Sequence, residues 1–151
     1  ASEDVGNAAP RALSVCVDAM RACHFIGMPE CDLALAQAVT YLAAAPKSNS
    51  LYAAYGEVKS DVRKHGALPV PLHIRNAPTR LMKDMGYGRG YKYAHSYPGH
   101  IVRQEHLPDK LAGRTYYHPG DQGFEKDIAS RLAARREELS RRLDDDGKDS
   151  D

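Results

Sequence analysis

Tryptophan is absent from this 151-residue chain, and cysteine is scarce, with three copies. An odd number of cysteines argues against a disulfide framework, and the spacing of Cys16, Cys23 and Cys31 matches no zinc motif. Cys16 and Cys23 stand two helical turns apart, which suits two small apolar side chains on one buried helix face. The cysteines therefore predict neither a disulfide scaffold nor a metal centre. They indicate a reducing, cytoplasmic environment.

Long apolar runs and a strong net charge are missing as well. The longest uncharged run, residues 33–46, is too short to cross a bilayer, which takes about 20 residues. Glu3 and Asp4 stand where a signal peptide would carry basic residues. The formal net charge is +1, so any attraction to nucleic acid has to be local. The short apolar run and the acidic start predict no membrane partner. Because the sequence begins Ala-Ser-Glu-Asp and not with Met, we expect a piece of a longer polypeptide.

Apolar residues recur at three- and four-residue spacings, which predicts helices. The predicted helices cover residues 10–26, 29–45, 50–65, 79–85 and 121–143. The second is rich in alanine and poor in charge, which predicts a helix buried at the centre of a bundle. The predicted fold class is all-α, an antiparallel helical array with a long ordered Gly/Pro/Tyr-rich loop segment and a C-terminal helix. We expect one helical turn in that loop near 109–111, one domain over 1–143 and a disordered acidic tail over 144–151.

Two motifs that could carry chemistry fail on spacing. The glycines between Gly86 and Lys92 lack the four-residue gap and the Gly-Lys-Ser/Thr ending of a phosphate-binding loop, so they predict a turn instead. Four histidines and Glu105 in the loop follow no ligand spacing for a metal. The four histidines are His95, His100, His106 and His118. The sequence therefore predicts no catalytic, nucleotide-binding or metal-binding residues and no cofactor in this chain.

A basic, tyrosine-rich segment over residues 75–97 is more informative. Between residues 75 and 92, five cations stand against the single acid Asp84, a local charge of +4. The candidate DNA contacts among these cations are Arg80, Lys83, Arg89 and Lys92. Cations that pair with phosphates and rings that stack on bases build nucleic-acid surfaces of low sequence preference. Alternatively, the tyrosines form a structural clasp that packs the loop or an oligomer interface. The candidate clasp residues are Tyr87, Tyr91, Tyr93 and Tyr97.

Several short motifs, in one order, resemble a known family. They are Ala1–Gly6, Leu35–Val39, Ala45–Asn49, Leu68–Leu72, Arg75–Thr79, Leu81–Lys83, Gly86–Tyr91, Tyr93–His95 and Gly123–Glu125. Together they resemble the C-terminal region of the replication-associated recombination protein A (RarA/MgsA) family of AAA+ ATPases, to which the Werner-helicase-interacting protein is related. The resemblance covers residues 1 to about 143. It departs from the family pattern at His106 and over Asn7–Ala9.

The resemblance implies a function that composition does not. Members are clamp-loader-like ATPases that act at stalled replication forks, in DNA replication, recombination and repair. They interact with DNA and single-strand-binding protein, are cytoplasmic and nucleoid-associated, and form homotetramers through this helical region. ATP and Mg²⁺ belong to a module that precedes it, and residues 1–28 resemble the end of a collar-like helical region. We therefore expect an oligomerisation and interaction domain. The alternative is a stand-alone single-stranded DNA-binding module that uses the segment 75–97.

Overall fold

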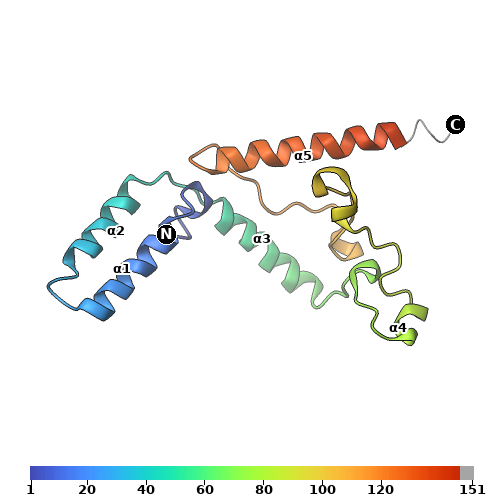
Figure 1. Cartoon of the computed structure of the whole chain (residues 1–151), viewed down its shortest axis with the longest axis horizontal. Coiled ribbons are helices and arrows are strands. Elements are labelled where there is room, and N and C mark those ends of the chain that lie inside the picture. The colour runs from blue at the N-terminus through green and yellow to red at the C-terminus, as the bar shows by residue number, and fades with distance from the viewer. Residues whose placement is uncertain (147–151) are drawn as a thin grey trace. The chain divides into compact units, whose positions relative to one another are not determined.

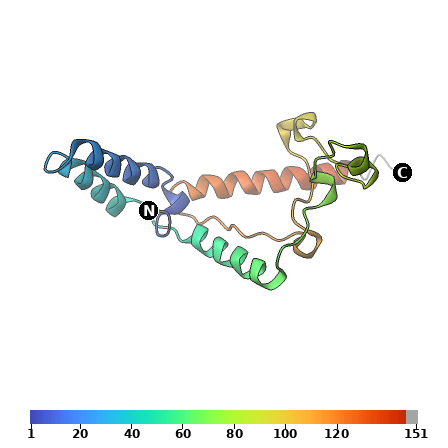
Figure 2. The ribbon, with the colours of Figure 1, turned by 90° about the horizontal axis from the view of Figure 1, so that it is seen from below.

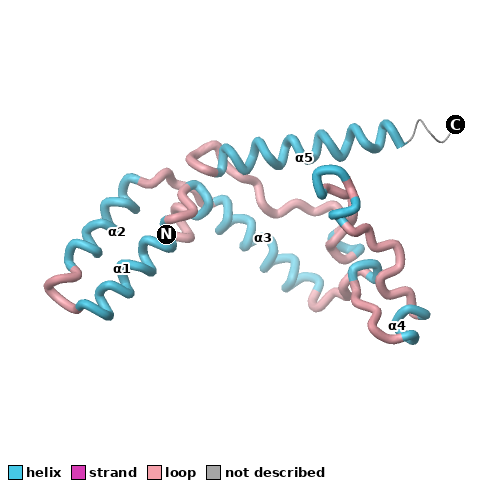
Figure 3. The backbone as a smooth tube through the Cα atoms, in the orientation of Figure 1, coloured by secondary structure: helices cyan, strands magenta, loops and turns pink. Residues whose placement is uncertain are grey.

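The computed structural model describes residues 1–146, with side chains up to Arg142. Its α-helices are α1 (Ala12–Ile26), α2 (Asp32–Ala44), α3 (Ser50–His65), α4 (Arg80–Asp84) and α5 (Glu125–Asp146). Single turns of 3-10 helix are η1 (Gly6–Ala8), η2 (Leu72–Ile74), η3 (Ala94–Ser96), η4 (Pro98–His100) and η5 (Asp109–Leu111). Residues 1–146 contain no strand (Figure 3), which confirms the all-α class. The turn η5 lies where the sequence predicts one.

Two compact units divide the chain, and each is discontinuous in sequence. The first unit comprises Ala1–Ser60 and Tyr116–Leu132, and the second comprises Asp61–Thr115 and the described residues from Ala133 onward. The single domain predicted over 1–143 thus contains two units. Of the tail predicted over 144–151, residues 144–146 continue α5, and 147–151 lie outside the described residues.

The first unit is built on an antiparallel hairpin of α1 and α2, which lie side by side in both views (Figures 1 and 2). Gly27 ends α1 at φ +83°, and its N–H donates to the Cys23 carbonyl. Asp32 lies in the first turn of α2, where a carboxylate stabilises the positive end of the helix dipole. The buried positions of the two helices are all alanine, Ala12 and Ala19 in α1 and Ala38 in α2. Small side chains let the two helix backbones approach closely.

The predicted burial of α2 at the centre of a bundle is wrong for this chain. Leu33 is 81% exposed, and Val39 is exposed as well. Among the described residues, α1 is the only α-helix that packs extensively against α2. The lack of charge on α2 therefore reflects an apolar surface that this single chain leaves uncovered.

Signals at the helix ends explain the remaining boundaries. Gly66, at φ +66°, follows α3, whose last turn is basic and complements the negative end of the helix dipole. Thr79 caps α4 by accepting a hydrogen bond from the Met82 N–H at 3.3 Å. The last helix, predicted to start at residue 121, begins at Glu125. The Asp121 carboxylate accepts a hydrogen bond from the Gln122 side-chain amide at 3.0 Å.

A buried carboxylate fastens the distant parts of the first unit together. Glu125 is 0% exposed and accepts hydrogen bonds from four donors. The donors are the Ser48 hydroxyl at 2.6 Å, the Ser50 hydroxyl, the Tyr117 hydroxyl at 2.8 Å and the Gly120 N–H at 2.8 Å. Burial raises the pKa of Glu125, but the four hydrogen bonds outweigh it and hold the pKa below its ordinary value. The carboxylate therefore stays ionised in the folded chain.

Glycine at position 123 lets two segments touch beside this carboxylate. Gly123 has φ +53°, and a Cβ at this position would overlap the Ala8 carbonyl and lie 2.6 Å from Pro46 Cγ. The next residue, Phe124, donates its N–H to the Ala8 carbonyl at 2.8 Å. The start of α5 is thereby anchored directly to η1.

Candidate functional site

The glycines of the basic segment form a turn in the second unit, half-buried at Gly86 and Gly88 and exposed at Gly90. Gly86, Gly88 and Gly90 all have positive φ, between +72° and +84°. This is the left-handed region that only glycine enters without strain, so the prediction of a glycine-supplied turn is confirmed. The Gly88 N–H donates to the Leu72 carbonyl at 2.9 Å, which fixes the turn on η2.

Arg75 and Tyr87 hold this turn in place. The Arg75 Nε donates to the Val70 carbonyl at 2.6 Å, and Nη1 donates to the Tyr87 hydroxyl at 3.1 Å. The Arg75 guanidinium also lies 5.0 Å from the centre of the Tyr87 ring. These contacts give both side chains a structural role, and Tyr87 is half-buried.

The four candidate DNA contacts, Arg80, Lys83, Arg89 and Lys92, are all exposed. None of their side chains makes a hydrogen bond or an ion pair with residues 1–142. Their positive charge is therefore uncompensated, while the one acid of the segment, Asp84, is exposed too. The structure leaves these cations accessible to an anionic partner.

Three of the four candidate clasp tyrosines are exposed in this chain. Tyr91 and Tyr93 are 53% and 57% exposed, and Tyr97 is exposed as well. The centre of the Tyr93 ring lies 5.1 Å from that of the His95 ring, its only ring partner among the described residues. A clasp made by Tyr91, Tyr93 and Tyr97 remains a prediction, since it would need a second surface to cover them.

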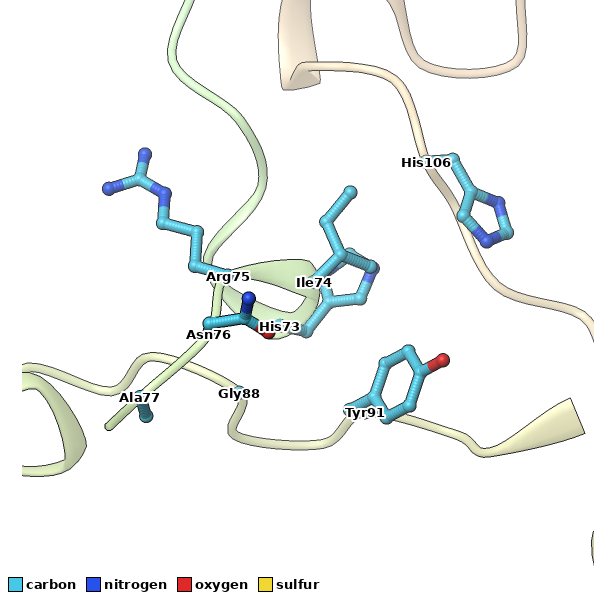
Figure 4. Close-up of a pocket in the computed structure, with 8 residues that line it drawn as sticks. All are labelled: His73, Ile74, Arg75, Asn76, Ala77, Gly88, Tyr91 and His106. Carbon is cyan, nitrogen blue, oxygen red and sulfur yellow. The ribbon is translucent and has the colours of Figure 1, made fainter.

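A cavity of about 500 Å³ lies beside the turn and is lined by both basic and aromatic side chains (Figure 4). Tyr91 and His106 come from two separate stretches of chain and lie on the side of the cavity away from Ala77. The Arg75 guanidinium extends away from Tyr91, in keeping with its bonds to Val70 and Tyr87. The Arg75 side chain therefore forms one edge of the cavity, with its charged end turned away from Tyr91.

Glu105 has a structural role in the long loop. Its carboxylate accepts the N–H groups of His106 and Leu107 at 2.8 Å and of Gly113 at 2.7 Å. These hydrogen bonds, led by that of Leu107, lower the pKa of Glu105. Within the described residues, no group of three or more His, Cys, Asp or Glu side chains is placed to hold a metal ion.

Sequence reasoning missed the most conspicuous surface of the first unit, the hairpin tip, which we define as residues 25–33. Its four large apolar side chains are strongly exposed, namely Phe25, Ile26, Met28 and Leu33. Phe25 is 82% exposed. Soluble proteins seldom leave several large apolar side chains together in water, and such clusters mark interaction sites. The signal available was the apolar run on either side of Gly27, which the helix pattern attributes to the core.

Fold and surface together define an all-α domain with uncovered apolar helices and an uncompensated basic segment. None of the helices that the structure describes has both the length and the apolar character to span a membrane. The family described as the C terminal of the MgsA AAA+ ATPase matches residues 1–136. The chain therefore belongs to this family, and the resemblance seen in its motifs is confirmed.

Sequence identity to individual relatives supports this membership. The chain is 48% identical over 133 residues to replication-associated recombination protein A of Coxiella burnetii, and 46% identical over 134 residues to that of Escherichia coli K12. These matches cover 87% and 88% of this chain but 30% of each relative. It is also 44% identical over 118 residues, 78% of this chain and 14% of the relative, to ATPase WRNIP1 of Dictyostelium discoideum. The chain thus spans under a third of the length of these relatives.

Proposed function

We propose that this chain is the oligomerisation and interaction domain of a clamp-loader-like AAA+ ATPase that acts at stalled replication forks. Family membership and the names of the relatives support a role in replication-associated recombination. In this proposal the domain joins four copies into a homotetramer. The observation that carries it is the uncovered apolar surface of the α1–α2 hairpin.

The hairpin tip has the chemistry of a protein interface. An aromatic ring, a methionine and two branched aliphatic side chains are exposed there, on Phe25, Met28, Ile26 and Leu33. Aromatic residues and methionine are enriched at the cores of interfaces, where charged residues are depleted. More apolar side chains are exposed on α1 and α2 behind the tip, among them Met20 and Val39. The helices therefore offer a surface with the composition of a protein interface.

A second copy of this chain is the partner that we assign to this surface. The net charge of the chain is +1, so copies do not repel one another strongly. An apolar surface that meets the same surface of another copy gives a self-complementary contact and closed symmetry, as most soluble oligomers have. Two such contacts of different kinds are enough for a tetramer.

The wider role of the whole protein is part of the same proposal. ATP and Mg²⁺ would be bound by a module that lies outside this chain, and this chain would contribute no catalytic or nucleotide-binding residue. The assembled protein would act on DNA and with single-strand-binding protein, in the cytoplasm at the nucleoid. The family supplies each of these expectations.

Light scattering on the 151-residue chain tests the assembly. We expect the mass of a tetramer at tens of micromolar, and a smaller mass for the double variant Phe25→Asp/Leu33→Asp. Two charges at the centre of an apolar contact would be desolvated without partners, which costs several kcal/mol. Both positions are exposed in the single chain, so the helix content of the variant should change little. Its melting temperature should fall only by the amount that assembly contributes.

The matched control is Leu81→Asp, at an exposed leucine of α4 in the second unit. It should keep the tetramer mass. A monomeric mass for the unmodified chain would refute the proposal, and so would a tetramer that survives the double change at the hairpin tip.

A further inference from the structure

The second unit contains a chain of cavities with shared walls. The cavity of about 500 Å³ in Figure 4 adjoins one of about 380 Å³, and Tyr91 and His106 line both. The second adjoins a cavity of about 140 Å³, with Lys92, Ile101 and Val102 in common. All lining residues belong to the second unit. The three cavities are therefore neighbours, and we treat them together as one groove.

The side chains along this groove carry one sign of charge. We call it the basic groove and define it by Arg75, Tyr91, Lys92, Arg103, His106 and Arg135. In the described part of the chain no aspartate or glutamate lines any of these three cavities, whereas Glu105 and Asp109 line a further cavity of about 500 Å³ that shares His73 and Arg75 with the first. The chain as a whole has a net charge of only +1. The groove is therefore a local concentration of positive charge that selects an anionic partner.

Three of the groove's cations are free to meet a ligand. The side chains of Lys92, Arg103 and Arg135 make no hydrogen bond or ion pair with residues 1–142. Two other arginines at the groove are already engaged. Arg75 is bonded to Val70 and Tyr87, and Arg142 is bonded to the Pro98 and Ile101 carbonyls at 2.8 Å and to Glu138. The engaged arginines shape the groove, and the free cations supply the charge.

Exposed aromatic rings line the cavities of the groove. Tyr91, which is 53% exposed, lines the two larger cavities with His106, and Tyr97 lines the smallest. Because Tyr91 lines both of the larger cavities, its ring offers a flat apolar surface there. Flat apolar groups joined by regularly spaced anions are the chemistry of an unpaired nucleic-acid strand. In a duplex the base faces are stacked and out of reach.

We infer that the basic groove binds a single strand of nucleic acid, with bases in the cavities beside Tyr91 and phosphates paired with Lys92, Arg103 and Arg135. Cavities of this size are within the range of small-molecule sites, so each of the larger two admits a base with its sugar. The groove lies in the second unit, and the hairpin tip lies in the first. The inference therefore stands independently of the self-association proposed above.

Fluorescence anisotropy with a labelled thymidine oligonucleotide of about 20 residues tests the inference on the 151-residue chain. Tyr91→Ala should weaken binding roughly 5- to 150-fold, the loss that accompanies removal of one stacking ring. Tyr91→Phe keeps the ring and should bind as the unmodified chain does. Arg135→Ala should weaken binding and flatten the log–log salt dependence by about 0.7. The melting temperatures of these surface variants should not change.

The matched control is Arg11→Ala, which removes an exposed arginine of the first unit. It should leave affinity and salt slope unchanged. The affinities for a thymidine and a uridine oligonucleotide of the same length are compared. Tighter binding of one of them identifies DNA or RNA as the preferred strand. Binding that is indifferent to Tyr91→Ala and Arg135→Ala would overturn the inference, as would equal competition by polyglutamate. Light scattering on the same samples reports self-association separately, so failure of either idea is recognised by itself.

Discussion

At the scale of single residues, Glu125 is the side chain on which the first unit depends most. Its carboxylate is completely buried and is the common acceptor of two serine hydroxyls, one tyrosine hydroxyl and one backbone N–H. Asn7 adds to the cluster by donating its side-chain amide to the Tyr117 hydroxyl at 3.0 Å. A buried acceptor with several donors is costly to change, because each donor is left without its partner.

We predict that Glu125→Gln lowers the free energy of unfolding by about 1–3 kcal/mol, since the amide replaces one acceptor oxygen with a donor. Glu137→Gln is the control. Glu137 is an exposed partner of Arg141 in α5, and its loss should cost no more than about 0.5 kcal/mol. Urea denaturation followed by circular dichroism measures both. Equal losses for the two variants would contradict the role of Glu125.

The same pair of variants has a predictable pH dependence. The folded pKa of Glu125 lies below its ordinary value of 4.5. Its stabilisation is therefore complete above that value and is lost as the pH falls through the folded pKa. The difference in unfolding free energy between the unmodified chain and Glu125→Gln should shrink from neutral pH to about pH 3. A difference that stays constant over this range would show that the ionised carboxylate is not what stabilises the fold.

At the scale of elements, the helices were largely predictable and their contacts were not. Gly27 and Gly66 end α1 and α3 as the sequence predicts, because a positive φ after a helix is a local requirement. Glu125 is the first residue of α5. An acidic residue at a helix start is ordinarily exposed to water and stabilises the helix dipole, so the local sequence does not indicate that Glu125 is buried. Ser48 and Ser50, which bury it, are 77 and 75 residues away in sequence. No local pattern contains that information.

The contact between η1 and the start of α5 depends on position 123 having no side chain. We predict that Gly123→Ala lowers the free energy of unfolding by about 2–5 kcal/mol, from overlap with Ala8 and from a strained positive φ. Gly66→Ala is the matched control, since Gly66 also has a positive φ but open space around it. It should cost about 1–2 kcal/mol, from strain alone. Equal urea midpoints for the two variants would contradict the close contact.

At the scale of the whole chain, the sequence predicted the family and the helical class, while the uncovered surfaces came only from the structure. Periodicity records that one face of a helix is apolar, but not whether the same chain or another chain covers it. The same limit applies to the basic segment. Spacing predicted an exposed glycine turn near Arg89 and Lys92, but the cavities depend on Arg103, His106 and Arg135, which are distant in sequence.

We predict that this chain by itself neither binds nor hydrolyses ATP. Three residues separate Gly86 from Gly90, and a tyrosine precedes Lys92, so the turn lacks the arrangement that wraps phosphates and reaches Mg²⁺. Calorimetric titration with MgATP should give no saturable heat. Saturation at micromolar ATP would contradict the prediction, and abolition of that heat by Lys92→Ala would trace it to the turn.

The discontinuity of the first unit has a consequence for how the chain is made. Its closing segment, Tyr116–Leu132, is synthesised only after the whole of residues 61–115. Until Glu125 emerges, Ser48 and Ser50 lack their acceptor, and η1 lacks the contact with Phe124. The contacts that join η1 and the start of α3 to α5 therefore cannot form until residues 61–115 have been translated. A protein cut at residue 115 would lose the fastening of the unit that precedes the cut.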